Sequence, residues 1–316
     1  MGQRVNYIVK ENNTTKIYYH HWRANTIVSD LYLGDEKFIE FVRTCKEVDD
    51  LINEPWIEGC VYIDLNRKLL AFWSWEFPRI TSLEHYYFSK LSKKWKDWDF
   101  KLLKRRMYDI EELIGYDYIK HQTFDFTNAS IEEIKDDKVT DWVQTLIIFK
   151  EIDGLFVTKT GSINIEGIIS IGQESIPLLK EKPSYKLEDQ NELQTEIFII
   201  DILERKIYSN DSNLGLWEHY HHLWEGYSFQ MGDFGLLEIL KLANIKTSKN
   251  IRLSEEKIVN EFNSLIKVSD DFDPKILAED SVNELGNDLE FNPNFFDNTK
   301  PKLEISFIQK IKNLFS

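Results

Sequence analysis

Four residues able to do chemistry follow one another near the start of the chain, as His20-His21-Trp22-Arg23. Alternating apolar residues predict strands over 5–10 and 15–20 that form a hairpin. Because facing positions of an antiparallel ladder lie close together, residues around the start of the first strand should meet this run. The side chains expected at this edge are Gln3, Arg4, Asn6, His20, His21, Trp22, Arg23 and Asn25.

This edge could bind a ligand that carries an anion or a ring, with arginine holding the charge and Trp22 stacking on the ring. One imidazole, His21 or His20, could also act as an acid–base catalyst. The alternative is structural, with polar side chains satisfying the strand ends and Trp22 filling the core. The residues by themselves leave both interpretations open.

A second candidate is the acidic stretch 269–298, which carries nine acidic residues and one base, Lys275. It lacks the Asp-x-Asp-x-Asp-Gly pattern of a calcium loop. Such a stretch could contact a basic partner through electrostatic steering, and the alternative is a solvated coil. The candidate partner-binding residues are Asp270, Asp271, Asp273, Glu279 and Asp280.

Two further clusters give weaker signals. Glu218, His221, His222 and Glu225 have helical spacing, but two ligands on one helix are half a site, so we predict no metal and no other cofactor. Lysines and arginines over 90–106 alternate with aromatic residues, as at single-stranded nucleic-acid sites. The aromatic residues recur later in the chain without the basic ones, and the acidic composition also argues against a nucleic-acid partner.

The elements that position these residues occur twice. Ile8-Val9-Lys10-Glu11 returns 140 residues later at 148–151, and the stretch around Gly34 returns 138 residues later around Gly172. We therefore expect that the second copy has lost two residues in its hairpin loop. Three further matches keep the same order: Ile63-Asp64 with Ile200-Asp201, Glu84-His85-Tyr86 with Glu218-His219-Tyr220, and Trp95 with Trp224.

The predicted fold class is α+β, with two tandem pseudo-repeated domains of antiparallel hairpins and helices on one sheet face. Copy one spans 1–116, a linker spans 117–144, copy two spans 145–245, and an acidic tail with a terminal amphipathic helix spans 246–316. Further strands are expected over 59–65, 68–74, 145–150, 154–159, 196–201 and 205–209, and helices from Asp35 and over 82–93 and 108–115.

Composition narrows the class of protein. The 316 residues are 42% hydrophobic, and 54 acidic against 39 basic residues give a net charge of −15. These values exclude a disordered or collagen-like chain, and two cysteines without metal-type spacing exclude a disulfide scaffold and suggest a reducing compartment. Because no apolar run reaches the length of a membrane span, we expect a cytoplasmic protein that does not contact a membrane.

The opening Gly2-Gln3-Arg4-Val5-Asn6-Tyr7, together with Tyr18-Tyr19-His20-His21-Trp22-Arg23-Ala24-Asn25, resembles the start of a group of uncharacterised bacterial proteins. Segments 56–59 and 95–98 are similar to that group too. The resemblance implies no activity, but it favours the edge around His21 as the functional part.

The leading functional hypothesis is a bacterial protein-binding protein, an immunity or inhibitor type that neutralises a basic effector. It rests on the acidity and on the lack of a complete catalytic set. The rival hypothesis is an enzyme, or a binder of an anionic or nucleotide-like ligand, that uses the His20–Arg23 edge. A purely structural role is the third.

Overall fold

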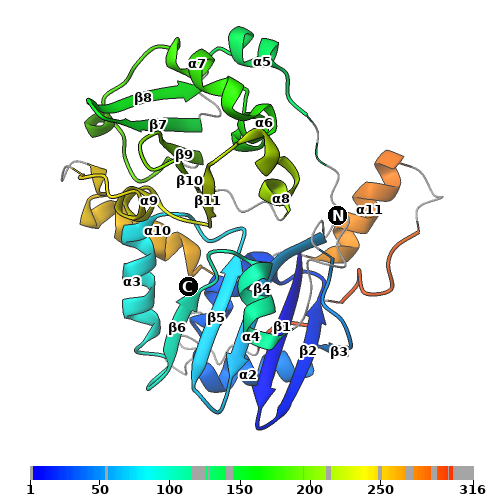
Figure 1. The fold of residues 1–316 in the computed structure, drawn as a ribbon. Coiled ribbons are helices and arrows are strands. Elements are labelled where there is room, and N and C mark those ends of the chain that lie inside the picture. The colour runs from blue at the N-terminus through cyan, green and yellow to red at the C-terminus, as the bar shows by residue number, and fades with distance from the viewer. Residues whose placement is uncertain are drawn as a thin grey trace.

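The computed structural model shows two α+β halves, each built on one mixed sheet (Figure 1), which confirms the predicted fold class. The described residues are 3–53, 56–115, 126, 128–139, 145–194, 196–210, 215–247, 251–267, 273–285, 290–297 and 299–301. Within these ranges every helix is too short or too polar to span a bilayer.

The described strands form two sheets with the same topology. The first sheet has the order β3-β2-β1-β4-β5-β6, and the second has the order β11-β10-β9-β7-β8. The strands of the first sheet are β1 (Arg4–Glu11), β2 (Thr14–His20), β3 (Lys46–Val48), β4 (Ile57–Asp64), β5 (Leu69–Ser74) and β6 (Asp99–Leu102). Those of the second are β7 (Thr145–Glu151), β8 (Gly154–Thr160), β9 (Glu196–Asp201), β10 (Lys206–Ser209) and β11 (Ser228–Met231). Thus β2-β1-β4-β5-β6 corresponds to β8-β7-β9-β10-β11.

Helices connect and cover these strands. They are α1 (Ile27–Leu31), α2 (Asp35–Thr44), α3 (Thr81–Leu91), α4 (Met107–Ile114), α5 (Ile131–Asp136), α6 (Ile165–Ile171), α7 (Ser175–Lys180), α8 (Leu216–Tyr220), α9 (Leu236–Leu242), α10 (Glu255–Leu265) and α11 (Pro274–Leu285). Short 3-10 turns lie at Ala24–Thr26, Gly172–Glu174, Leu187–Asp189 and His221–Leu223.

The prediction that helices cover one sheet face is wrong, because helices pack on both. In the first half α1–α3 share one core with Tyr7 and Val61, whereas α4 packs on the opposite face against Tyr62 and Trp73. In the second half α6 and α8 cover one face and α9 covers the other. Uninterrupted apolar runs such as 197–200, whose members are all fully buried, are typical of strands covered on both sides.

The predicted antiparallel hairpins form, and parallel strand pairs join them into mixed sheets. β1 pairs in parallel with β4, and β5 pairs in parallel with β6. The same two parallel pairs occur between β7 and β9 and between β10 and β11. The four-residue strands β6 and β11 were not predicted, and each follows a helix that brings the chain back in the same direction.

The expectation that copy two has a shorter hairpin loop is wrong. Glu11 faces Thr14 in the first hairpin and Glu151 faces Gly154 in the second, so the two loops have equal length. The loss therefore falls between the end of β8 and α6. Consequently Thr160, rather than Thr158, is the counterpart of His20, because each faces the equivalent strand residue, Thr145 or Val5.

One buried contact recurs in both copies. The indole of Trp95 donates a hydrogen bond to the carbonyl of Leu31 (2.7 Å), and that of Trp224 donates to the carbonyl of Ile169 (2.9 Å). Three residues after each carbonyl comes a glycine with positive φ, 101° at Gly34 and 80° at Gly172. A Cβ on Gly172 would lie 2.7 Å from the carbonyl oxygen of the residue before Trp224, so this position excludes a side chain.

The two halves pack through equivalent elements (Figure 1): α4 of the first half contacts the residue before α8, and α9 of the second half contacts the start of α3. Tyr108 at the start of α4 accepts a hydrogen bond from the backbone N–H of Gly215 before α8 (3.0 Å). In the reciprocal contact the N–H of Glu238 in α9 lies 3.3 Å from the hydroxyl of Thr81 at the start of α3. Such reciprocal pairing of matching surfaces defines a pseudo-twofold interface.

The buried Arg23–Asp30 ion pair belongs to copy one alone, since copy two has the buried Ile168 at the position of Asp30. We predict that Arg23→Ile lowers the free energy of unfolding by about 3–5 kcal/mol, because it removes the Arg23 cation from the buried Asp30 carboxylate, to which the Thr26 hydroxyl still donates (2.8 Å). The double change Arg23→Ile/Asp30→Ile should recover most of that loss. Urea denaturation of the three proteins measures it; additive losses would contradict the prediction.

Candidate functional site

The predicted edge around His20 does form in the backbone. Val5 faces His20 and Asn6 faces Tyr19 across the β1–β2 ladder. Before β1, the N–H of Gln3 donates to the carbonyl of His21 (2.9 Å), so the N-terminal residues lie beside the 20–23 run as expected.

The side chains at this edge diverge, however. Asn6 is buried and links β2 to the segment before β4, donating to the Tyr18 carbonyl (3.2 Å) and accepting from the N–H of Ile52 (2.8 Å). The Arg4 guanidinium stacks on Trp56, with 5.1 Å from its central carbon to the ring centroid. Arg23 turns inward to Asp30. Gln3 is half-buried and Asn25 is exposed.

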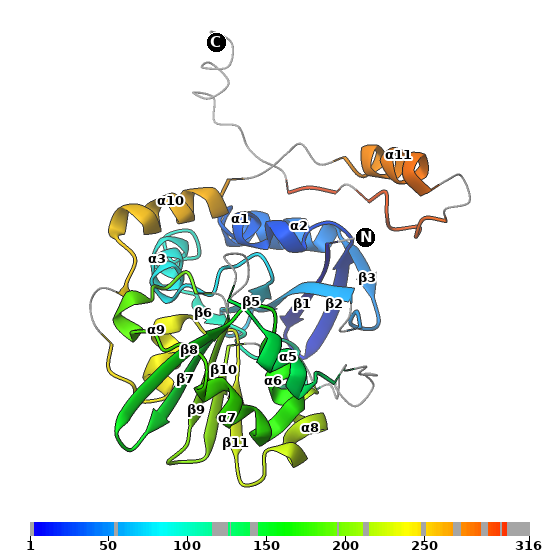
Figure 2. The same cartoon turned by 90° about the horizontal axis from the view of Figure 1, so that it is seen from above.

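His20, His21 and Trp22 are covered by a stretch from the far end of the chain, residues 290–297 and 299–301, which we call the strap. Figure 2 shows α11 and the strap beside α2 and the N-terminus. The Trp22 indole donates to the carbonyl of Phe295, and its ring lies 5.0 Å from the Phe295 ring in an edge-to-face arrangement. The His20 Nε2 lies 2.9 Å from the carbonyl oxygen of Thr299.

The contacts of His20 fix its protonation state. Its Nδ1 accepts a hydrogen bond from the N–H of Trp22 (3.0 Å), so the proton sits on Nε2 and is donated to Thr299. Burial lowers the pKa of His20 to about 4, and the nearby Asp297 carboxylate opposes this only in part. His20 is therefore neutral beneath the strap.

The acidic residues proposed for partner binding fall into three groups. Asp270 and Asp271 lie outside the described residues, as does the predicted terminal helix. Asp273 accepts a hydrogen bond from the N–H of Lys275 (2.9 Å) at the start of α11. Glu279 and Asp280 are exposed on α11.

The Glu218–Glu225 cluster also has structural partners. Glu218 accepts a hydrogen bond from the Tyr108 hydroxyl (3.1 Å), and the rings of His221 and His222 bond to backbone carbonyls one turn earlier. Within the part of the chain that the structure describes, no three His, Cys, Asp or Glu side chains gather at metal-binding distance.

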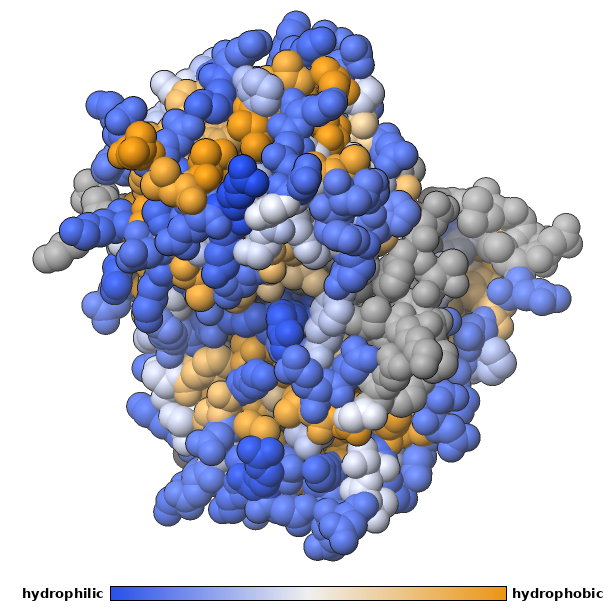
Figure 3. All heavy atoms as spheres, viewed as in Figure 1, coloured by the Kyte–Doolittle hydropathy of each residue, from blue (hydrophilic) through white to orange (hydrophobic). Residues whose placement is uncertain are grey.

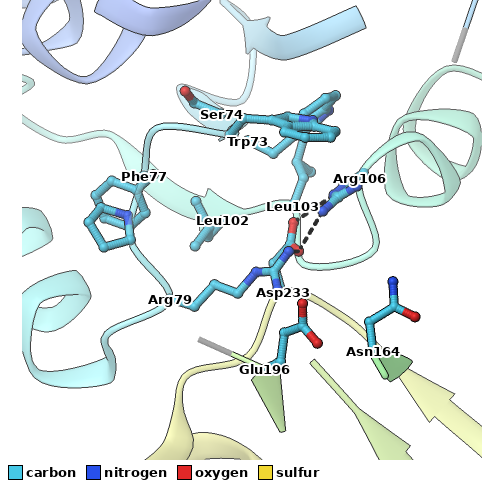
Figure 4. A pocket seen from close by; sticks show the side chains of 12 residues that line it. Trp73, Ser74, Phe77, Arg79, Leu102, Leu103, Arg106, Asn164, Glu196 and Asp233 are labelled. Atoms are coloured by element: carbon cyan, nitrogen blue, oxygen red, sulfur yellow. Dashed lines mark hydrogen bonds and ion pairs between the residues drawn. The ribbon is translucent and has the colours of Figure 1, made fainter. Parts of the chain in front are cut away.

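One cavity lies where the two halves meet, a hollow of about 390 Å³ that we call the interdomain pocket (Figure 4). Copy one supplies the ends of β5 and β6 and the start of α4, and copy two supplies the starts of α6, β9 and α9. The lining residues are Trp73, Ser74, Trp75, Phe77, Pro78, Arg79, Leu102, Leu103, Arg106, Asn164, Glu196 and Asp233. Figure 3 shows strongly hydrophilic side chains along the junction of the halves.

Two arginines converge on one carboxylate in this pocket. Arg106 makes a bidentate contact with Asp233 (3.0 and 3.2 Å), and the guanidinium of Arg79 lies 3.1 Å from the same carboxylate. Asp233 comes from copy two and both arginines come from copy one. A bidentate guanidinium–carboxylate pair sets the orientation of both groups.

Arg106 is held in a backbone conformation that a side chain disfavours. Its φ is 46° and its ψ is −117°, at the residue that precedes α4. Its guanidinium lies 5.2 Å from the ring centroid of Trp75 and 5.7 Å from that of Trp73. Strain of this kind concentrates at binding sites, where the surrounding structure over-determines one side-chain position.

The aromatic wall of the pocket has two unusual features. Trp75 is 64% exposed, although a large apolar ring normally contributes to a core. Trp73 is buried, yet its indole N–H has no hydrogen-bond partner among the described residues. A buried unsatisfied donor costs about 1–3 kcal/mol, so Trp73 carries a free-energy cost that packing alone does not explain.

The opposite wall is polar and comes from copy two. Glu196 accepts a hydrogen bond from the Thr145 hydroxyl (2.6 Å) at the start of β9. Asn164 caps α6 by accepting from the N–H of Gly167 (2.9 Å). Carboxylate, amide and guanidinium groups therefore line one cavity beside an exposed indole ring.

Sequence reasoning missed this pocket. One signal was available: Trp73-Ser74-Trp75 ends a strand of copy one, whereas copy two has Asn210 at the position of Trp73. The comparison between copies would have flagged Trp73, but the convergence of Arg79, Arg106 and Asp233 depends on how the halves pack.

No protein-family model, curated protein or solved structure matches the chain.

We predict that acid loosens the strap. The pKa of His20 beneath the strap, about 4, lies below its ordinary 6.5, so the stability that neutral His20 contributes is complete above about pH 6.5. It is lost as the pH falls toward 4. Hydrogen–deuterium exchange should show that the protection of Phe295 and Asp297 amides decreases over this range. His20→Asn should remove that pH dependence, and an unchanged profile would contradict the assignment.

Proposed function

We propose that the protein binds a small ligand that combines a planar ring with an anionic group, of which a nucleoside monophosphate is the type, in the interdomain pocket. The observation that carries this proposal is the convergence of Arg79 and Arg106 beside the exposed ring of Trp75. Arginine suits the anion and the indole face suits the ring.

The position of the pocket supports binding. It lies between two domains and at the carboxyl ends of the parallel strands β5 and β6, both common locations of ligand sites. Its volume of about 390 Å³ falls within the range of small-molecule sites.

Asp233 supports an anionic ligand in particular. Because it comes from copy two and pairs with both arginines of copy one, it occupies the place that a ligand anion would take. An anion that enters the pocket competes with Asp233 for Arg79, whose side chain is the more exposed of the two arginines (26% against 6%).

The ligand class is the one expected for the His20–Arg23 edge, but the proposed site differs. At that edge His20, His21, Trp22 and Arg23 are all buried. The strap contacts the polar groups of His20 and Trp22, Tyr19 contacts that of His21, and Asp30 contacts that of Arg23. The interdomain pocket offers a guanidinium and an indole face around a hollow.

Binding of a basic protein is a second candidate, favoured by the surface of α11. Exposed Glu279 and Asp280 lie there beside exposed Ile276 (57%), and Phe296 (48% exposed) lies against the same helix. Acidic side chains beside apolar ones suit an immunity-type interface with a basic effector.

Capture from lysates of producing cells tests this second candidate. Glu279→Lys/Asp280→Lys should abolish capture of a basic protein because the charge of the surface is reversed. The matched change Glu255→Lys/Glu256→Lys, on exposed positions of α10, should leave it intact. Equal capture by both variants would contradict the assignment to α11.

Calorimetric titration with adenosine monophosphate, adenosine and inorganic phosphate tests the pocket. We predict that the monophosphate binds at least about tenfold more tightly than either fragment, because only it engages ring and anion sites together. Arg79→Gln should weaken its binding about tenfold, ~1.4 kcal/mol. Trp75→Ala should weaken it by about 0.5–1.5 kcal/mol. Asp233→Asn should strengthen it, since the competing carboxylate is removed.

Trp56→Ala is the matched control, because Trp56 is also exposed (57%) and also stacks with an arginine, outside the pocket. Its affinity for adenosine monophosphate should equal that of the unaltered protein. Equal binding of phosphate alone, or an Arg79→Gln protein with unchanged affinity, would refute the proposal.

A further inference from the structure

In each copy, a segment from outside that copy lies across the end of the second strand and presents an aspartate there. In copy two this is Asp137, which accepts hydrogen bonds from the N–H groups of Gly161 (3.0 Å), Ser162 (2.5 Å) and Ile163 (3.2 Å). Burial alone would raise the pKa of Asp137, but these hydrogen bonds and Lys182 outweigh it and lower the pKa.

In copy one the corresponding aspartate is Asp297 of the strap, whose carboxylate lies 3.7 Å from Nε2 of His20. His20 ends β2 just as Thr160 ends β8, the residue before Gly161. The same place in the duplicated fold therefore receives an acidic segment twice, although the two segments lie at unrelated positions in the chain.

The strap is recognised mostly through its main chain. Trp22 and His20 donate to the carbonyls of Phe295 and Thr299, so these two contacts require no particular side chain from the strap. Selectivity comes from the ring of Phe295, which packs on Trp22 and lies 5.7 Å from His21, and from Asp297. Main-chain hydrogen bonds combined with side-chain pockets are the usual mode of peptide recognition.

We propose that the surface formed by His20, His21 and Trp22 is a peptide-docking groove and that the strap is its occupant in cis. A peptide of a partner protein with the same chemistry, an aromatic residue followed two positions later by an acidic one, binds there in trans after the strap leaves. Phe295 and Asp297 supply this pattern in cis. The proposal is independent of the interdomain pocket.

The cis occupant sets the affinity for a trans peptide. A tethered segment competes at an effective concentration on the order of millimolar. The apparent affinity of the trans peptide equals its intrinsic affinity multiplied by the fraction of molecules whose groove is open, so a closed groove lowers it. Weakening the strap without altering the groove should therefore strengthen binding of the trans peptide.

Fluorescence anisotropy with the full chain and a labelled peptide of residues 290–301 tests this inference. Phe295→Ala in the protein should raise the affinity for the peptide at least about tenfold, because it opens the groove. Leu203→Ala is the matched control: Leu203 is an apolar side chain, 55% exposed, in the turn between β9 and β10, and its loss should leave the affinity nearly unchanged.

Two further measurements identify the groove. Adding Trp22→Ala to the Phe295→Ala protein should abolish the gain. If that variant fails to fold, the Phe295→Ala protein can be titrated with peptides that carry Phe295→Ala or Asp297→Asn, which should bind at least about fivefold more weakly than the native peptide. A Phe295→Ala protein that binds no more tightly than the unaltered chain, or altered peptides that bind equally well, would overturn the proposal.

Discussion

The fold depends on one buried contact made twice, the hydrogen bond from an indole N–H to a carbonyl three residues before a glycine with positive φ. In copy one it links Trp95 to Leu31, and in copy two it links Trp224 to Ile169. Both indoles are almost fully buried (0% and 1% exposed), and the glycines that follow, Gly34 and Gly172, allow the backbone to approach closely. This contact fixes the helix after the first hairpin to the turn before β6 or β11, so it joins the first and last parts of each copy.

Because the same contact holds both copies in the same shape, they can pack through matching surfaces. The residues that differ between the copies then determine the charge and the cavity at the interface. Lys104 and Asp233 occupy equivalent positions, and the N–H of Asp233 donates to the carbonyl of Lys104 (2.6 Å). The Lys104 ammonium lies between Glu84 of copy one and Glu238 of copy two, whereas Asp233 receives Arg79 and Arg106. Two equivalent positions of the copies, Lys104 and Asp233, therefore carry opposite charges where they meet. The interdomain pocket opens beside the arginines that bind Asp233.

The sequence predicted the repeated part of this architecture well, because hydrophobic alternation and local turns record it directly. The strands around Ile63 and Ile200 and the helix over 82–93 are all present. The short strands β6 and β11 escaped prediction, since four residues give too little alternation and their pairing partners lie 30 and 22 residues earlier in the chain. The predicted edge was correct in the backbone, but burial of His20 depends on Thr299, which no local pattern places there. The pocket was missed for the same reason, because Arg106 and Asp233 meet only after both halves have folded.

The most direct test of the account is hydrogen exchange of the indole N–H groups, followed by NMR on protein labelled with nitrogen-15 at tryptophan. If the two contacts anchor the two halves, the indoles of Trp95 and Trp224 should exchange only through unfolding of their half, far more slowly than those of Trp56 and Trp75. Exchange of Trp95 or Trp224 as fast as these exposed indoles would contradict the claim that a shared buried contact organises both copies.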